Sequence, residues 1–268
     1  ADLRRHLACQ TGLPVALIDL PTLQAGGGPA ALASVDAGGA VLIDGVDAAS
    51  LAIAGEMLWS EAGRRSLFCA GSSGVTQALV AAWRAAGLAS GAAPAARAEP
   101  VDTLLVISGS CSPVTSAQIG IAIEAGYEGI ALSPKALVAD PGEIERAAAR
   151  AVAALGAGRN CVLYTARGPL AGGEAAGDAL GSALGRMLRR IVSTADVPRV
   201  LLAGGDTSSH AVAELGLDAL TWAARLQRGS PLCRAHATGS PLDGLELVLK
   251  GGQIGSPDFF ERTRLGTG

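Results

Sequence analysis

One stretch of the sequence, residues 198–210 (PRVLLAGGDTSSH), has the residue types and spacing of an anion-binding site. An apolar run that predicts a buried strand is followed by Gly204 and Gly205, then by polar residues, then by AVAEL, which predicts a helix. A helix that begins just after a glycine pair offers free backbone N–H groups and its positive dipole end to an anion such as phosphate. The glycines permit a positive φ or close approach of a ligand. The open alternative is an ordinary strand–loop–helix corner with a good N-cap.

The polar residues of this stretch could hold a metal–phosphate complex or cap the helix. Asp206, Thr207 and Ser208 bring a carboxylate and two hydroxyls, the groups that phosphoryl transfer uses to bind Mg²⁺ and phosphate oxygens. Asp206 is the candidate acid for Mg²⁺, although capping is the more common role of such a residue. His210, one turn later, could act as a base or stand at the surface. The sequence assigns no catalytic base, and Asp206 is the one candidate for a catalytic residue.

Two other predicted strands end in small polar or glycine residues. Ser110 follows Gly109 after a strand at 102–109, and Lys250 precedes Gly251 and Gly252 near the end of the chain. In open α/β sheets, ligands bind beyond the carboxyl ends of the strands, so the three loops are expected to converge. Three ordinary tight turns in a glycine-rich chain are the alternative. Lys250, one of two lysines in the chain, is the candidate for a phosphate contact, with a solvent-facing lysine as the equal alternative.

Composition excludes several classes of protein. The net charge is −3 and aromatic residues make up 3%, so neither a polycationic face nor a stacking platform for nucleic acid is expected. Five scattered cysteines form no CxxC pair, which disfavours a zinc site or a disulfide framework and favours the cytoplasm. No apolar run is long enough to span a membrane. No Walker A signature is present. The GxGxxG fingerprint of dinucleotide-binding sites is also missing, which disfavours an NAD-linked oxidoreductase.

The elements that position these loops alternate between strands and helices, so we expect an α/β fold of two domains, each a mostly parallel sheet flanked by helices. The proline- and alanine-rich segment 87–100 predicts a linker, with domains at 1–97 and 98–268. Apolar periodicity is strongest in a predicted helix at 180–192. Strands are predicted at 13–20, 38–45, 66–71, 102–109, 129–134, 160–166 and 200–203, and in the run LELVLK.

Three motifs together resemble the four-carbon acid sugar kinase family: SGSCSPVTSAQI (108–119), LLAGGDTSSHAVAELG (201–216) and LKGGQIGSPDFF (249–260). The resemblance implies an ATP- and Mg²⁺-dependent kinase acting on threonate, erythronate or a 3-oxo-tetronate type of acid. It also implies that the C-terminal domain binds the nucleotide and that the N-terminal domain binds the acid sugar. By motif, the ATP contacts would be Ser110, Gly204, Gly205, Asp206, Thr207, Ser208, Lys250, Gly251 and Gly252.

One departure from the family pattern concerns the first domain. The family's Asp-Asp motif followed by Thr-Gly has no match in residues 1–97, so these residues are expected to be the remainder of a truncated acid-sugar-binding domain. Such a chain would bind nucleotide while being inactive. A non-catalytic nucleotide-binding or regulatory protein that keeps the fold is therefore the alternative to a kinase. The expected partner is a small acid sugar, and an alanine-rich apolar surface makes a homodimer plausible.

Overall fold

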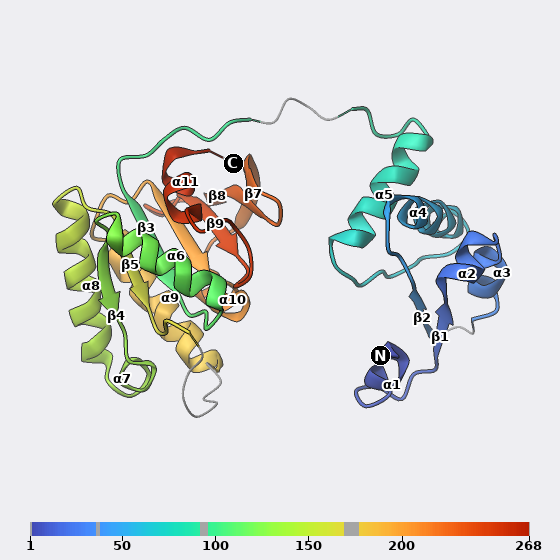
Figure 1. The fold of residues 1–268 in the computed structure, drawn as a ribbon, viewed down its shortest axis with the longest axis horizontal. Coiled ribbons are helices and arrows are strands. Elements are labelled where there is room, and N and C mark those ends of the chain that lie inside the picture. The colour runs from blue at the N-terminus through green and yellow to red at the C-terminus, as the bar shows by residue number, and fades with distance from the viewer. Residues whose placement is uncertain (1, 36–37, 92–95, 169–176, 268) are drawn as a thin grey trace. The chain divides into compact units, whose positions relative to one another are not determined.

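The computed structural model of the protein describes residues 2–35, 38–91, 96–168 and 177–267, and for Asp206 it describes the backbone alone. The chain forms two compact units, residues 1–93 (unit 1) and 94–268 (unit 2), whose helices and strands are labelled in Figure 1. The predicted domain boundary after residue 97 stays a prediction.

Unit 1 has a small parallel sheet covered by helices. Strand β1 (Val15–Ile18) pairs in parallel with β2 (Ala40–Ile43), with Val15 opposite Ala40. Apolar side chains from β1 and the helices, among them Ile18, Leu23 and Met57, form its core. The helices are α1 (Leu3–Leu7), α2 (Leu20–Gln24), α3 (Gly28–Ala33), α4 (Ala48–Ala62) and α5 (Ser73–Ala85).

The prediction of a third strand at 66–71 was wrong. These residues form no regular structure, and Phe68 is 95% exposed. An apolar run becomes a strand only where a neighbouring strand takes up its backbone N–H and C=O groups, and the sequence does not reveal that partner.

The residues of β2 are only partly buried, unlike those of a parallel strand covered on both faces.

Unit 2 is built on a seven-stranded sheet in the described part of the chain, with the strand order β4-β5-β3-β6-β9-β8-β7. Strands β4, β5, β3, β6 and β9 run parallel, and β8 and β7 are antiparallel additions at one edge. The strands are β3 (Leu104–Ser108), β4 (Glu128–Ala131), β5 (Cys161–Tyr164), β6 (Arg199–Ala203), β7 (Ala219–Gln227), β8 (Ser230–His236) and β9 (Glu246–Lys250).

Helices cover both faces of this sheet (Figure 1). Along β3, Leu105 and Ile107 face the core shared with α8, α9 and α10, whereas Leu104 and Val106 face the core shared with α6 and α11. A strand buried on both faces reads as a continuous apolar run, which is why the sequence predicts it well. The helices are α6 (Pro113–Glu124), α7 (Pro134–Ala139), α8 (Pro141–Gly156), α9 (Asp178–Val192), α10 (Gly205–Leu215) and α11 (Phe259–Leu265).

The hairpin of β7 and β8 has no counterpart among the predicted strands. Its strands pair across a two-residue turn, with Gln227 opposite Ser230 and Gly229 at a φ of 81°. A glycine in a two-residue connection is a hairpin signal that the sequence does offer.

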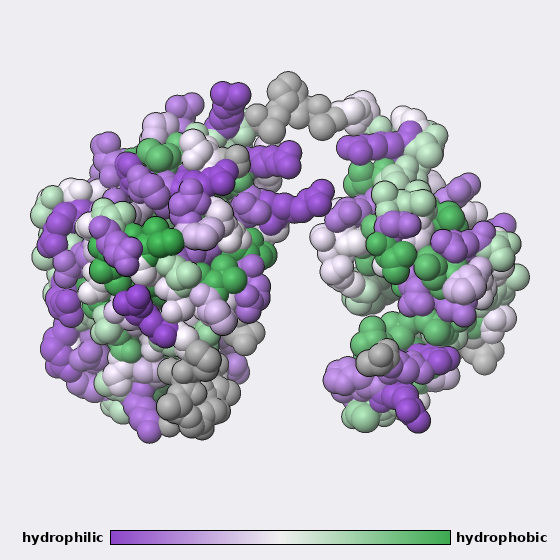
Figure 2. Space-filling view, viewed as in Figure 1, coloured by the Kyte–Doolittle hydropathy of each residue, from purple (hydrophilic) through white to green (hydrophobic). Residues whose placement is uncertain are grey.

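Hydrophilic side chains cover much of the face drawn in Figure 2, with separate hydrophobic patches on both units. Within the described ranges, no helix combines the length and the apolar character needed to cross a membrane.

Candidate functional site

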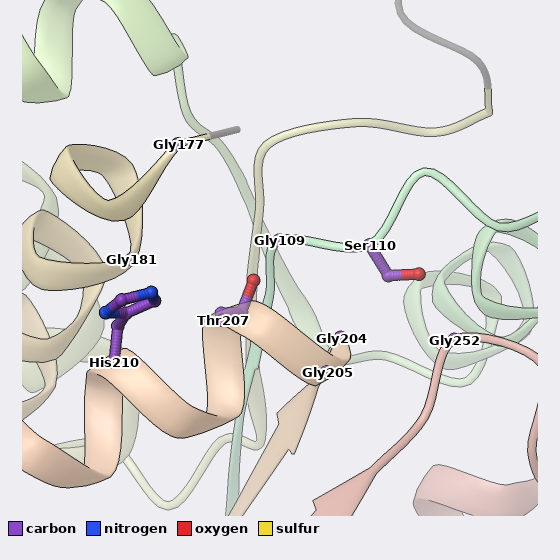
Figure 3. A pocket seen from close by; sticks show the side chains of 9 residues that line it. All are labelled: Gly109, Ser110, Gly177, Gly181, Gly204, Gly205, Thr207, His210 and Gly252. Atoms are coloured by element: carbon purple, nitrogen blue, oxygen red, sulfur yellow. The ribbon is translucent and has the colours of Figure 1, made fainter. Parts of the chain in front are cut away.

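A cavity of about 180 Å³ opens at the carboxyl edge of the unit 2 sheet, where the parallel strands end. The loops after β3, β6 and β9 meet there, as predicted for ligand sites of open α/β sheets. Figure 3 shows the wall as mostly glycine backbone, with the side chains of Ser110, Thr207 and His210 around the space. The lining residues are Gly109, Ser110, Gly177, Gly181, Gly204, Gly205, Thr207, His210 and Gly252.

Helix α10 begins at the cavity without a side-chain cap. Its N-cap residue, Gly204, has a φ of 121°, a backbone conformation that L side chains rarely adopt. Gly204 has no side chain that could accept from the N–H groups of the first turn, and the first backbone bond of the helix runs from Ser208 N to Gly204 O at 2.9 Å. Gly204 at the N-cap position therefore gives no side-chain cap, and capping of the helix by Asp206 stays a prediction. The free amides of the first turn are suited to an anion.

Helix α9 also begins at the cavity, a feature that was not predicted from the sequence. Its N-cap, Gly177, has no side-chain cap bond. A Cβ added at Gly181 would lie 2.6 Å from the Cβ of His210, so this glycine lets α9 and α10 pack closely. Two helices thus begin at one cavity, each with its positive dipole end there.

Three further glycines line the cavity in the described part of the structure. Gly109 and Gly252 permit close packing, whereas Gly205 borders open space. A Cβ at Gly109 would overlap the hydroxyl of Thr207, and a Cβ at Gly252 would lie 2.7 Å from Ser110 Oγ. A Cβ at Gly205, in contrast, would meet no atom within 4 Å. A side chain at position 205 would therefore fit the fold while occupying the space beside the cavity.

The structure brings together five of the predicted contact residues, Ser110, Gly204, Gly205, Thr207 and Gly252, and leaves three others off the cavity wall. Lys250, Gly251 and Ser208 do not line it. The hydroxyl of Ser208 is buried and donates to Gly204 O at 2.6 Å, and a Cβ at Gly251 would face Ile254. The side chain of Asp206 lies outside the described part of the structure, so its predicted roles stay predictions.

Lys250 is buried behind the loop that follows β9. Its side chain is 1% exposed, and its ammonium donates to Thr115 Oγ1 at 2.8 Å, Gly251 O at 3.1 Å and Gly252 O at 3.3 Å. Burial lowers the pKa of this amine from 10.5 to about 8. Lys250 therefore does not face solvent, which was one of the two predictions from the sequence. It is also not part of the cavity wall, so the predicted direct contact with phosphate stays a prediction.

Four lining residues were not among the predicted contacts: Gly109, Gly177, Gly181 and His210. His210 Nε2 lies 3.1 Å from Asp178 Oδ1 across the gap between α10 and α9. Gly177 and Gly181, four residues apart at the start of the most periodic helix, were the available signal. Their role depends on which helix packs against α9, and periodicity alone does not reveal that.

Phosphate groups fit this donor set, since backbone amides and hydroxyls surround the space. In the described part of the chain, no group of three or more His, Cys, Asp or Glu side chains could hold a metal by itself. A divalent ion bound mainly through phosphate oxygens, as Mg²⁺ commonly is, needs few protein ligands. The site therefore suits an anion that brings its own metal.

An open α/β sheet with two uncapped helix starts at the carboxyl ends of its strands defines an anion- or nucleotide-binding class of domain. Residues 105–260 match the family model described as a nucleotide-binding C-terminal domain, and residues 1–79 match that of a sugar-binding N-terminal domain. The chain belongs to the four-carbon acid sugar kinase family. This confirms the resemblance found in the three motifs.

Curated relatives of this chain have names that specify kinases. It is 41% identical to a 3-oxo-isoapionate kinase of Paraburkholderia graminis, over 99% of this chain and 61% of that protein. It is 33% identical to a 3-oxo-tetronate kinase of Methylobacterium radiotolerans, over 98% of this chain and 62% of that protein. The chain thus spans about three fifths of the length of these relatives.

Solved structures share the fold at low sequence identity. The crystal structure of a protein from Salmonella typhimurium described as a putative tRNA synthase aligns with a TM-score of 0.70 and 22% identity, over 99% of this chain and 63% of that one. That of a Haemophilus influenzae protein aligns with a TM-score of 0.59 and 24% identity, over 98% and 63%. These alignments support the α/β class predicted from the sequence.

Proposed function

We propose that the cavity of unit 2 binds the phosphates of ATP and that the chain is part of an ATP-dependent kinase for a small acid sugar. Both curated relatives quoted above are named for 3-oxo acids, so a 3-oxo acid is our first choice of substrate. Threonate and erythronate remain candidates from the motif resemblance.

The observation that carries this proposal is the convergence of two uncapped helix starts on one glycine-walled space. Phosphoryl transfer depends mainly on positioning and on neutralising charge on phosphate oxygens. Backbone amides at helix starts supply both without a flexible side chain. The hydroxyls of Thr207, in the first turn of α10, and of Ser110, in the loop after β3, add donors to the cavity wall (Figure 3).

ATP would supply the phosphoryl group and Mg²⁺ would offset its charge. A hydroxyl oxygen of the acid sugar would form the new bond to phosphorus, its proton would leave, and the bond from that phosphorus to ADP would break. On the protein side, we assign phosphate binding to the first turn of α10, to Ser110 and to Thr207. We assign to the Asp206 carboxylate the contact with Mg²⁺.

Nucleotide binding is tested most directly at Gly205. Because a side chain there meets open space, Gly205→Val should keep the fold but weaken ADP binding by at least about tenfold, measured by isothermal titration calorimetry with Mg²⁺. Gly156→Val is the matched control, since Gly156 ends α8 and also borders open space. Equal ADP affinity of the Gly205 variant and the unaltered chain would exclude this cavity as the nucleotide site.

Catalysis needs a second measurement. ADP release from ATP by the full-length chain is followed with a panel of four-carbon acids and their 3-oxo forms, and a substrate-dependent rate supports the kinase. ADP binding without release for any acid supports the second candidate, a nucleotide-binding protein without catalysis. The homodimer and the location in the cytoplasm stay predictions from the sequence.

A further inference from the structure

The loop after β9 is held from behind by α6. The hydroxyl of Thr115 donates to Gly252 O at 2.7 Å while accepting a hydrogen bond from the Lys250 ammonium. One turn along α6, Gln118 Nε2 donates to Ile254 O at 3.1 Å and to Ser256 O at 2.8 Å. The carbonyl groups of this loop therefore point toward α6 and Lys250.

The direction of these carbonyls fixes the direction of the amides. In a planar trans peptide, the C=O and the following N–H point in opposite directions. With the oxygens of Gly251 and Gly252 on Lys250, the N–H groups of Gly252 and Gln253 point away from the ammonium. Gly252 lies on the cavity wall, next to Ser110, so the donor side of this loop is the side that an anion can reach.

We propose that Lys250 is a positioning residue of the phosphate site, which orients the Gly251–Gly252 peptides and makes anion binding depend on its own positive charge. The inference rests on the proposed function, because it takes the anion to be a nucleotide phosphate. Lys250 acts through the peptides without touching the ligand. A cation at the oxygen end of a peptide polarises it and strengthens its N–H as a donor.

The partners of the ammonium in the described part of the structure are neutral oxygens. Its three donors are used by Thr115, Gly251 and Gly252, and burial is the cause that lowers its pKa. A bound phosphate would supply negative charge nearby and favour the protonated form. Ligand affinity and the proton on Lys250 are therefore reciprocally linked.

None of the other charged groups on the surrounding elements is a partner of the ammonium in the described part of the structure. Arg199 and Glu246 pair with each other at the amino ends of β6 and β9. Glu124 ends α6, and Asp258 follows the loop and accepts from Ser256. The side chain of Asp206, at the start of α10, is not described.

The chain has only two lysines, so the proton on Lys250 can be observed directly. In protein labelled with ¹³C-lysine, NMR should show two side-chain signals, and Lys135→Met identifies that of the exposed Lys135. ADP at saturation should raise the titration midpoint of Lys250 by about one pH unit for a tenfold preference for the protonated form. The midpoint of Lys135 should stay unchanged.

Variants test the same linkage through affinity. ADP binding by the unaltered chain should weaken between about pH 7 and pH 9.5, a range in which a lysine with a lowered pKa loses its proton. Lys250→Met should bind at least about fivefold more weakly at the lower pH and lose this pH dependence. Lys135→Met should behave as the unaltered chain does. Thr115→Val, which removes one acceptor of the ammonium, should weaken binding and lower the Lys250 midpoint further.

The fold should survive Lys250→Met, because both carbonyls keep a donor. Gly251 O still accepts from Ile254 N, and Gly252 O still accepts from Thr115. If the unaltered chain binds no ADP, the proposed function fails and the inference with it. If ADP binds while the Lys250 midpoint stays fixed, or Lys250→Met binds ADP as tightly as the unaltered chain, the inference alone is overturned.

Discussion

Two buried cations lie at the two ends of the parallel strands of unit 2, and their surroundings differ. Arg199 lies at the amino ends of the strands (the amino edge), and Lys250 lies at their carboxyl ends (the carboxyl edge). At the amino edge, Arg199 is 0% exposed and bonds to Glu246 through Nε and Nη2, at 2.8 and 2.6 Å. It also reaches the carbonyls of Thr263 and Glu99. At the carboxyl edge, Lys250 is nearly as buried, but its described partners are a hydroxyl and two carbonyls.

The difference separates an edge that holds the domain together from the edge where we propose that a ligand binds. Arg199 ties the entering segment at Glu99 and the end of α11 to two strands, so its charge is balanced inside the fold. Lys250 brings a positive charge that the described fold leaves without a carboxylate. A buried charge without a counter-ion costs stability, and it is retained where a ligand supplies the missing charge.

The largest expected effect comes from removing the amino-edge cation. Arg199→Met should destabilise the protein by about 3 kcal/mol or more, because it leaves the Glu246 carboxylate and buried carbonyls without their donor. Urea denaturation measures this loss. The control is Arg234→Met, since Arg234 lies 3.8 Å from the same carboxylate but is 55% exposed, and should cost under about 0.5 kcal/mol. Equal losses would show that burial is not what separates the two arginines.

Removing the carboxyl-edge cation, Lys250, should change the stability of the protein in the opposite direction. The pKa of Lys250 is about 8 in the fold and near its ordinary 10.5 when unfolded, so the unfolded chain binds more protons between these values. The unaltered protein should therefore gain stability as pH rises from about 8 to 10.5, by up to about 3 kcal/mol.

Lys250→Met removes that gain and should be at least as stable as the unaltered chain near neutral pH, as measured by thermal unfolding across pH without ligand. A variant that is less stable by as much as Arg199→Met would mean that the two cations play the same role, and the contrast between the edges would fail.

A smaller effect is expected where α9 and α10 meet at the cavity. Gly181→Ala places a methyl group 2.6 Å from His210 Cβ, so the helices must separate, at a cost of about 1–3 kcal/mol. Urea denaturation checks the cost, and ADP titration checks whether the cavity widens. Gly156→Ala serves as control because its methyl meets open space, and replacing a helical glycine there should be neutral or stabilising. A neutral Gly181→Ala would show that the close approach is not required.

The carboxyl edge was more predictable from the sequence than the amino edge. Apolar runs indicate the parallel strands, and the glycines after them indicate loops at one edge, which is why Ser110, Gly204 and Gly252 were found. The direction of a long side chain is not encoded in the same way. Lys250 ends a strand and precedes two glycines, a position equally compatible with reaching phosphate and with folding back onto α6.

Features that depend on contacts between distant segments were missed for a physical reason. The role of Gly181 requires knowing that α10 packs against α9, and the irregular 66–71 segment requires knowing which strand would pair with it. The irregular register of β7 and β8, shifted between Trp222 and Ala224, breaks the alternation that marks a strand. Arg199 at the start of a strand gave no sign of its partners at Glu99 and Thr263, which lie far away in the sequence.

The smallest effect is expected from a substitution of Glu261 at the amino edge. This residue joins α11 to Tyr127, just before β4. Its carboxylate accepts from Arg264 Nη2 at 2.6 Å and from the Tyr127 hydroxyl at 3.0 Å, and Arg264 also donates to Val101 O. The hydrogen bond from Arg264 is the main cause that holds the pKa of Glu261 below its ordinary 4.5. A depressed carboxyl pKa contributes stability above the unfolded value, and this contribution disappears as pH falls through the folded value.

Glu261→Gln should therefore lower stability at neutral pH by about 1 kcal/mol or less, since the pair is partly exposed to solvent. The thermal stabilities of the two proteins should converge as pH falls from the ordinary 4.5 through the depressed folded pKa of Glu261, below which the carboxylate is protonated in either state. Glu145→Gln is the control, because that carboxylate is 61% exposed in its pair with Arg190 and should contribute nothing measurable. A gap between the Glu261 variant and the unaltered chain that persists in acid would mean that shape and packing, rather than charge, hold this part of the amino edge together.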